Sequence, residues 1–372
     1  MAQPTLNAFA AIPQALRSQF RKDIQALVQK EDSPLWQNRD AQSSFIVQRA
    51  DANLHLPMHV GGFTDFMCAY EHVEVMGALS GHGKVPSNFY SIPLAYNGRA
   101  SSVAVSGTPV TRPWGHVPTP DGPKFQPSQK LDFEVEMGIF ISKPLATGDF
   151  VSAVQAHDHI FGLVLLNDWS ARDIQFYEMV PLGPFNGKAF GTSISPWVVT
   201  LDALEEAGAL IAAEPSDLPG GKWTTEQFLS HSQDISIQVT TYLSSTLGEQ
   251  GRYKSLFAQS NLKHLHWSPF QMVAHQSSAG CGLDSGDLLG TGTMSSTAHE
   301  AQADGVPPAT GRSGCLQEAT KDAEYPIQLG DGVQMTWLED GDEVIMEAWA
   351  GSGKTKIGFG DLCAKVLPAK IF

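Results

Sequence analysis

Basic side chains and long apolar runs are scarce in this sequence. Its 372 residues include 24 Lys and Arg against 39 Asp and Glu, which gives a formal net charge of −15. Because nucleic-acid phosphates are bound mainly by Lys and Arg, this balance argues against a nucleic-acid partner. No apolar run reaches the roughly 18 residues of a membrane span, and the N-terminus lacks the basic start and apolar core of a signal peptide. We therefore expect neither membrane insertion nor secretion.

Cysteine is also rare, with four residues in the whole chain: Cys68, Cys281, Cys315 and Cys363. None belongs to a C-x-x-C pair, and their spacing matches no zinc signature. Sparse, scattered cysteines are typical of a reducing compartment, which favours a cytoplasmic location. Each cysteine is expected to be a small buried hydrophobic side chain.

Short alternating stretches outnumber helical ones, and this pattern predicts a mainly β fold with some α-helix. The length allows two domains, or one large β-rich domain with a small appendage. Within residues 1–30, five apolar side chains share one face of a predicted helix. We expect this face to pack against the rest of the protein; it comprises Leu16, Phe20, Ile24, Leu27 and Val28.

The stretch from Leu131 to Thr192 carries the most distinctive pattern. At its start, apolar residues alternate with acids as in a strand, so that one face carries Asp132, Glu134 and Glu136. Neighbouring carboxylates repel each other and are costly to bury, and a hard cation is a common remedy. The apolar run over residues 161–166 predicts a buried strand that leads to Asp168. The alternative is a solvated strand edge followed by a turn aspartate.

A second stretch, GFTDFMCAYEH, places His72 seven residues after Asp65. If the segment is helical, the two side chains lie on one face, two turns apart. Asp65 could then hold a metal, and His72 could act as a general base. A lone histidine is more often a packed or surface residue, so the local spacing leaves both interpretations open.

Several longer motifs resemble the fumarylacetoacetase family, namely GFTDF, YNGRASSVAVSGTP, LDFEVEM and NDWSARDIQ…VPLGPFNGKAFGT. The resemblance runs from about Pro4 to Ala369. It implies that residues 51–372 form the family's catalytic domain, a mixed β-sandwich roll, and that the chain forms homodimers. Residues 1–50 would be a helical remnant, with most of the family's small N-terminal domain missing.

The resemblance also implies a role for each matching polar residue. A divalent cation, Mg²⁺ or Ca²⁺, would be held by Asp65, Glu134, Glu136 and Asp168, with Lys188 and Thr192 beside them. His72 would activate water, oriented by Glu318. Developing negative charge would be stabilised by Arg172, Gln175 and Lys188, and the substrate would be contacted by Tyr96 and Thr293.

Three departures from the family pattern fall among the substrate contacts. Two family tyrosines correspond to Met67 and Met179, and the arginine that follows the catalytic histidine has no counterpart, with only Lys84 nearby. Thioethers replace neither hydroxyl donors nor a guanidinium. The expected activity is therefore hydrolysis of a carbon–carbon bond in a 1,3-diketone or acylpyruvate other than fumarylacetoacetate.

Three alternatives stay open on the sequence. The chain could be an authentic fumarylacetoacetase of tyrosine and phenylalanine breakdown. It could use the same metal-dependent chemistry as a lyase, decarboxylase or cyclase of secondary metabolism. It could also be a non-catalytic binding protein, although four converging carboxylates weigh against that.

Overall fold

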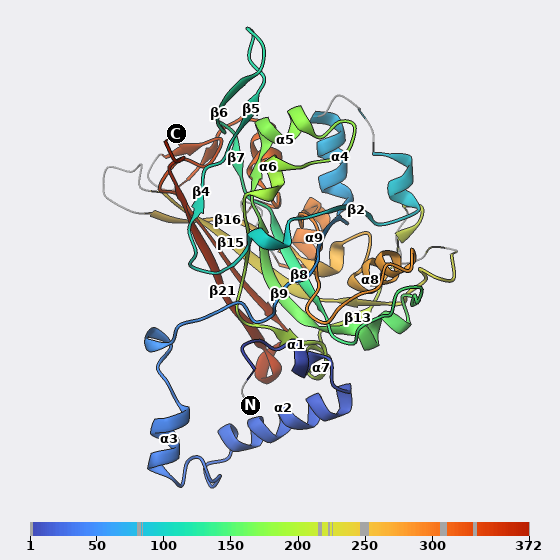
Figure 1. Cartoon of the computed structure of the whole chain (residues 1–372), viewed down its shortest axis with the longest axis vertical. Helices are drawn as coiled ribbons and strands as arrows, with labels where there is room; N and C mark the ends of the chain where they lie inside the picture. Colours follow the sequence, from blue (N-terminus) through green and yellow to red (C-terminus); the bar gives the residue numbers. More distant parts are fainter. Residues whose placement is uncertain are drawn as a thin grey trace.

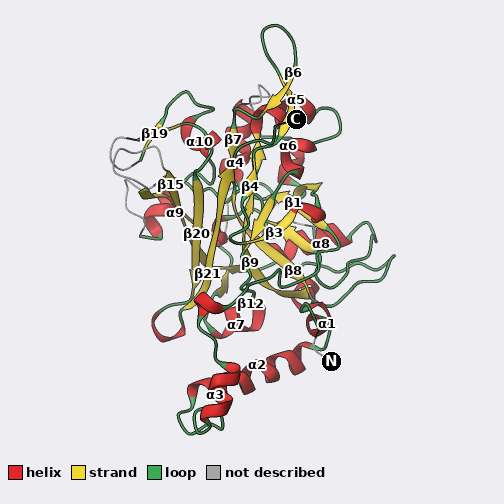
Figure 2. Cartoon of the chain, turned by 60° about the vertical axis from the view of Figure 1, so that its left-hand side comes forward, coloured by secondary structure: helices red, strands yellow, loops and turns green. Residues whose placement is uncertain are grey.

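Two mixed β-sheets packed face to face form the centre of the molecule in the computed structural model (Figures 1 and 2). The structure describes residues 3–79, 83, 85–214, 218–221, 224, 226–245, 253–305, 311–329 and 333–371. One buried cluster draws on both sheets, with Met137 and Leu163 from the larger and Val239 and Met346 from the smaller. Because each sheet buries a face against this cluster, the predicted mainly β, two-layer architecture is confirmed.

The larger sheet has the strand order β2-β1-β17-β8-β9-β11-β3, with β12 also paired to β9. Its strands are β1 (Phe63–Met67), β2 (Leu94–Asn97), β3 (Val103–Val105), β8 (Val135–Ile141), β9 (Ile160–Asp168), β11 (Thr192–Ile194), β12 (Val199–Thr200) and β17 (Leu288–Gly290). Two pairs are parallel, β1 with β17 and β11 with β3. Every residue of β8 and β9 is buried, which is why both strands are so rich in apolar residues.

The smaller sheet has the order β16-β15-β20-β21-β4. Its strands are β4 (Val110–Thr111), β15 (Ile237–Ser245), β16 (Tyr253–Asn261), β20 (Glu343–Ala350) and β21 (Ile357–Leu367). Buried residues alternate with partly exposed ones along β20, so only one face of this sheet contacts the core. Four two-stranded sheets pair β5 (Trp114–Val117) with β6 (Lys124–Pro127), β7 (Leu131–Asp132) with β10 (Ser170–Ala171), β13 (Leu210–Ala212) with β14 (Gln233–Ile235), and β18 (Ile327–Gln328) with β19 (Gln334–Met335).

Ten α-helices are described: α1 (Asn7–Ala10), α2 (Gln14–Gln29), α3 (Arg39–Phe45), α4 (Tyr70–Leu79), α5 (Arg172–Glu178), α6 (Asn186–Ala189), α7 (Leu201–Glu206), α8 (Pro269–Ser277), α9 (Ala298–Ala303) and α10 (Leu316–Thr320). Among them, none is both long and apolar enough to cross a membrane. Helices α4, α5, α6 and α10 gather at the same end of the sheets (Figure 2). Side chains from three of them, His72 of α4, Arg172 of α5 and Lys188 of α6, lie within 4 Å of Glu134 at this end.

Two sequence-based expectations about packing are wrong. Helix α2 forms where expected, but it projects from the body (Figure 1), and its five apolar side chains are 42–60% exposed. The helical spacing indicates an apolar face but not what covers it. Helix α2 contacts the rest of the protein through the ring of Phe20, 5.4 Å from that of Phe9, and through Arg21, which pairs with Asp202 at 3.0 Å and Glu206 at 2.6 Å. Likewise, Cys281 is exposed rather than buried.

Candidate metal centre and active site

Four buried carboxylates meet at one end of the larger sheet. Asp65 lies on β1, Glu136 on β8 and Asp168 at the end of β9, while Glu134 directly precedes β8. One oxygen of each acid lies within 4.8 Å of the chosen oxygen of the other three. Strand pairing brings them together, because β17 joins β1 to β8, and β8 pairs with β9. The structure thus assembles the four predicted ligands, and the alternative of a solvated strand edge is wrong.

Gly290 on β17 makes room for two of these acids. A Cβ atom at this position would lie 2.6 Å from Asp65 Oδ1 and 2.8 Å from Glu136 Oε2, closer than real contacts allow. Nearby, the backbone N–H of Gly292 donates to Glu136 Oε2 at 3.0 Å. The sequence singles out neither glycine, since both lie in the glycine-rich segment GDLLGTG, which matches no binding motif considered above. Only the pairing of β17 with β1 and β8 reveals their role.

Lys188 neutralises part of the charge of this cluster, and two hydroxyl groups donate hydrogen bonds to it. Lys188 Nζ pairs with Glu134 and, at 2.8 Å, with Asp168. Asp168 also accepts hydrogen bonds from Tyr96 Oη at 2.7 Å and Thr192 Oγ1 at 2.9 Å. Burial opposes the charge on Lys188, but the carboxylates of Asp168 and Glu134 outweigh it and raise the pKa of Lys188 above its usual value. The lysine therefore stays charged beside the acids.

Asp65 and Glu136 are left short of partners. Burial, reinforced by neighbouring carboxylates, raises the pKa of both acids well above the usual range. Among the described residues, Asp65 Oδ1 and Glu136 Oε1 have no hydrogen-bond partner. A hard divalent cation supplies the charge and the coordination that these oxygens lack. The four acids therefore fit a cation of the Mg²⁺ or Ca²⁺ type.

His72 lies between this centre and Glu318. It belongs to α4, and its Nδ1 forms a short contact with Glu318 of α10, while its Nε2 lies 3.9 Å from Glu134 Oε1. Both members of the pair are buried, with 5% and 8% of their surfaces exposed. Ser295 Oγ lies 2.8 Å from each Glu318 oxygen and holds the carboxylate in place. The predicted histidine–glutamate pair is therefore present, although Asp65 and His72 lie on a strand and a helix rather than on one helix.

Arg172 is tied to two carboxylates. Its Nε donates to Asp132 Oδ2 at 2.9 Å, and its Nη1 lies 2.9 Å from Glu134 Oε1. Asp132 also accepts the backbone N–H groups of Leu316 and Gln317, at 2.8 and 3.0 Å, at the start of the helix that carries Glu318. Sequence analysis grouped Asp132 with Glu134 and Glu136 on one face. Its actual partners show that it connects Arg172 to α10 instead of holding a cation.

A cavity of about 390 Å³ opens in front of these groups. Eight of the predicted catalytic and substrate-contact residues line it: Met67, His72, Tyr96, Arg172, Gln175, Met179, Lys188 and Thr293. Thr293 Oγ1 is buried without a hydrogen-bond partner among the described residues. Most of the remaining wall is apolar and was not identified from the sequence, including Val73, Met76, Leu94, Phe176, Val180 and Pro184. Lys84 lies outside the described residues.

A mixed two-sheet fold that places four converging acids and a His–Glu pair behind one cavity has the arrangement expected of a metal-assisted hydrolase. The chain belongs to the fumarylacetoacetase family. The family model described as fumarylacetoacetate (FAA) hydrolase C-terminal matches residues 62–367, and the model described as fumarylacetoacetase N-terminal matches residues 1–57.

Proteins named fumarylacetoacetase are similar over nearly the whole chain. That of Aspergillus fumigatus is 40% identical over 99% of this chain and 84% of its own length. The Bos taurus protein is 38% identical over 100% and 85%, and the Homo sapiens protein 37% identical over 99% and 84%. A crystal structure of Cg1458 with inhibitor has a TM-score of 0.50 at 16% identity, covering 86% of this chain and 81% of that one, and shares the fold.

These matches correct one expectation and weaken another. Because the N-terminal family model matches residues 1–57, the idea that most of the N-terminal domain is missing is not supported. The names of the relatives favour an authentic fumarylacetoacetase over a hydrolase with a different substrate. The division of the chain at residue 50 stays a prediction.

Proposed function

We propose that this chain hydrolyses a carbon–carbon bond in a 1,3-diketone, with fumarylacetoacetate as its first candidate substrate. Relatives that bear this enzyme's name are 37–40% identical over at least 99% of the chain, which supports this substrate. The reaction type rests on the position of His72, which meets Glu318 through one nitrogen and faces the four-carboxylate centre with the other.

The proposed reaction begins with activation of water. A divalent cation held by the four acids, Mg²⁺ or Ca²⁺, would supply Lewis-acid polarisation of the substrate carbonyl groups. His72 takes a proton from water, while Glu318 orients the imidazole and offsets the positive charge that develops on it. The resulting hydroxide attacks the carbonyl carbon next to the bond that breaks.

Hydrogen-bond donors around the cavity stabilise the negative charge that develops on the carbonyl oxygen after this attack. Lys188 and Gln175 line the cavity and are placed to stabilise the developing oxyanion, and Arg172 fixes Glu134 beside them. When the carbon–carbon bond breaks, its electron pair stays on the α-carbon of the departing ketone fragment, and His72 returns a proton to that carbon. The oxygen of the water ends in the new carboxylate.

The test is incubation with fumarylacetoacetate in ¹⁸O-labelled water, with mass analysis of the products. Label in one carboxylate of the fumarate is expected, and none in the acetoacetate. The variant His72→Ala removes the base, whereas His55→Ala changes an exposed histidine and serves as its matched control. Turnover without label would contradict hydrolysis and favour a lyase or decarboxylase, and absence of both turnover and metal binding would favour a binding protein.

An acylpyruvate with an apolar acyl group is the second candidate substrate. The cavity wall carries three thioethers, Met67, Met76 and Met179, which offer apolar contact and only weak acceptors. Of the described cations that line the cavity, Arg172 and Lys188 already pair with carboxylates of the protein. A distal carboxylate on the substrate would therefore find few free donors among these residues.

We propose a homodimer, in the first place from the family resemblance. The exposed apolar face of α2 offers a surface of the kind that subunits bury. Light scattering on the purified protein tests this proposal directly, since a monomeric mass across a broad concentration range would contradict it.

A further inference from the structure

A second cluster of possible metal ligands includes His72 and two residues on the side of its ring that faces away from the carboxylate centre. His72, Cys315 and Glu318 are all buried, and one donor atom from each lies within 4.8 Å of the other two. His72 Nδ1 contacts Glu318, and Cys315 Sγ lies 3.6 Å from Glu318 Oε1. A nitrogen, a sulfur and an oxygen donor thus converge on one small volume.

We propose that His72, Cys315 and Glu318 form a second metal site, one that takes Zn²⁺. Zinc is bound in proteins by this combination of donors, and sites with three protein ligands keep a fourth position for water. The carboxylate centre differs in kind, because its donors are all hard oxygens that suit Mg²⁺ or Ca²⁺. A thiolate ligand favours Zn²⁺ over those hard cations, so the two sites would select different ions.

The groups around the three donors resemble those that orient zinc ligands. Ser295 Oγ, 2.8 Å from both Glu318 oxygens, restricts the carboxylate. The second nitrogen of His72 faces Glu134, and a carboxylate behind a ligating histidine is a common partner in zinc sites. Burial raises the pKa of the Cys315 thiol well above its usual value, so zinc must also displace that proton.

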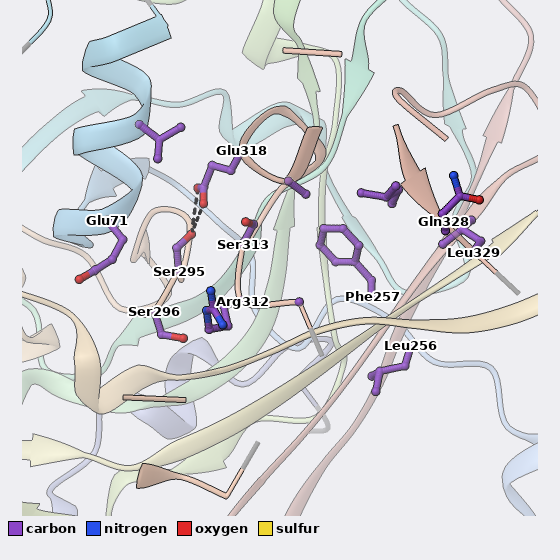
Figure 3. Close-up of a pocket in the computed structure, with 14 residues that line it drawn as sticks. Glu71, Leu256, Phe257, Ser295, Ser296, Arg312, Ser313, Glu318, Gln328 and Leu329 are labelled. Carbon is purple, nitrogen blue, oxygen red and sulfur yellow. Dashed lines mark hydrogen bonds between the residues drawn. The ribbon is translucent and has the colours of Figure 1, made fainter. Parts of the chain in front are cut away.

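A second cavity lies beside this site and is lined by one of its three ligands, Glu318. It has a volume of about 510 Å³ and reaches Glu318, together with Ser295, Ser296 and Ser313 (Figure 3). Glu318 lines this cavity, whereas His72 lines the cavity in front of the carboxylate centre. An ion and its water ligand could therefore enter without passing a bound substrate.

Zinc at this position would engage the base and its carboxylate partner together. His72 could then no longer take a proton through the arrangement proposed above, so zinc would inhibit hydrolysis even with the carboxylate centre saturated by Mg²⁺. This consequence rests on the proposed function, but binding of the ion does not.

Binding is tested with Co²⁺ as a spectroscopic substitute for Zn²⁺, added to the full chain in excess Mg²⁺. A thiolate bound to Co²⁺ gives a near-ultraviolet charge-transfer band, which oxygen ligands do not give. We expect this band in the natural protein and in Cys281→Ser, which removes an exposed cysteine, but not in Cys315→Ser or Cys315→Ala. Absence of the band in the natural protein, or its persistence in both Cys315 variants, would overturn the proposal.

Inhibition is measured separately, as the zinc concentration that halves the rate of each variant relative to its own uninhibited rate. Loss of an outer partner of a metal ligand typically weakens binding 10–100-fold, so loss of the ligand itself should shift this concentration by about 100-fold or more. An unchanged value in both Cys315 variants would place the inhibitory zinc elsewhere and contradict the proposal. If no substrate is turned over, the proposed function fails while the Co²⁺ result still decides the site.

Discussion

The carboxylate centre and the wall of the cavity in front of it are built in opposite ways. The centre consists of buried acids on paired strands, and Lys188, Tyr96, Thr192 and the backbone of Gly292 fix their oxygens. The wall consists largely of apolar side chains, which come from strands β1 and β2, from helices α4 and α5 and from loops. Under the proposed function, we therefore expect substitutions in the centre to affect the rate of the reaction and substitutions in the wall to affect which substrate is bound.

The largest effect should come from the centre. Glu136→Gln keeps the shape of the side chain but removes a charged cation ligand, so we expect kcat/KM to fall by about 10⁴-fold, the equivalent of several kcal/mol of lost Lewis-acid stabilisation. Calorimetry should show weaker binding of Mg²⁺ or Ca²⁺, with the fold unchanged by circular dichroism. Glu347→Gln, at a half-exposed pair with Lys254, is the matched control. Full turnover by metal-stripped protein would show that the centre has no part in the reaction.

The His–Glu pair should give the next largest effect. His72→Ala should lower kcat by roughly 10²–10⁴-fold, the usual contribution of a placed general base, with metal affinity at the carboxylate centre little changed. Glu318→Gln should reproduce much of that loss, because the two residues act as a unit. Steady-state kinetics on the two single variants and the double variant test this. A Glu318 variant with normal kcat would show that the glutamate does not assist His72 in the reaction.

Glu71 offers a test of stability on the same helix as His72. Burial, followed by the charges of Glu300 and Glu318, raises its pKa from 4.5 to about 7. The folded chain therefore binds this proton more tightly than the unfolded chain, and stability falls as the pH rises from about 4.5 to 7. Glu71→Gln cannot ionise, so it should raise the free energy of unfolding by roughly 1–3 kcal/mol at pH 8 and by little at pH 4.

Urea unfolding of the Glu71→Gln variant at both pH values provides the measurement. Glu74→Gln, an exposed position one turn along α4, is the control and should show no comparable pH dependence. A gain of equal size at pH 4 and pH 8 would mean that the Glu71 carboxylate is not the source of the effect.

The smallest effect should come from the wall. Changing Met67 and Met179 together to Tyr adds two hydroxyl donors to the cavity, which should favour a substrate with a distal carboxylate. We expect the ratio of kcat/KM for fumarylacetoacetate to that for an apolar acylpyruvate to rise about tenfold, or 1.4 kcal/mol. Met76→Leu leaves the wall apolar and should leave the ratio unchanged. A ratio that stays constant in the tyrosine variant would show that Met67 and Met179 do not determine which substrate is preferred.

The strands and the acids of the centre could be predicted from the sequence because both leave local signals. The apolar run of β9 is continuous, and the acids before and within β8 alternate with apolar residues at the period of a strand. The resemblance then connected Asp65 and His72 to these acids, which local spacing alone had left open.

Other features could not be predicted, because they depend on contacts between distant segments. The role of Gly290 follows from its pairing with β1 and β8, and the convergence of Cys315 with His72 has no counterpart in cysteine spacing. The α2 face was misjudged because amphipathic spacing does not say whether a partner surface exists. The role of Asp132 could not be predicted, because its spacing matches that of Glu134 and Glu136 while its hydrogen bonds go to Arg172 and α10.

The position of Asp132 also makes two backbone groups useful as probes. The amide protons of Leu316 and Gln317 are held by the same carboxylate that holds Arg172. Their exchange with deuterated solvent should therefore slow or quicken with the state of the active site, although neither residue lines the cavity in front of the metal centre. Two amide signals would then report, in the protein without substrate, whether Asp132 still holds Arg172 and the start of α10 in place.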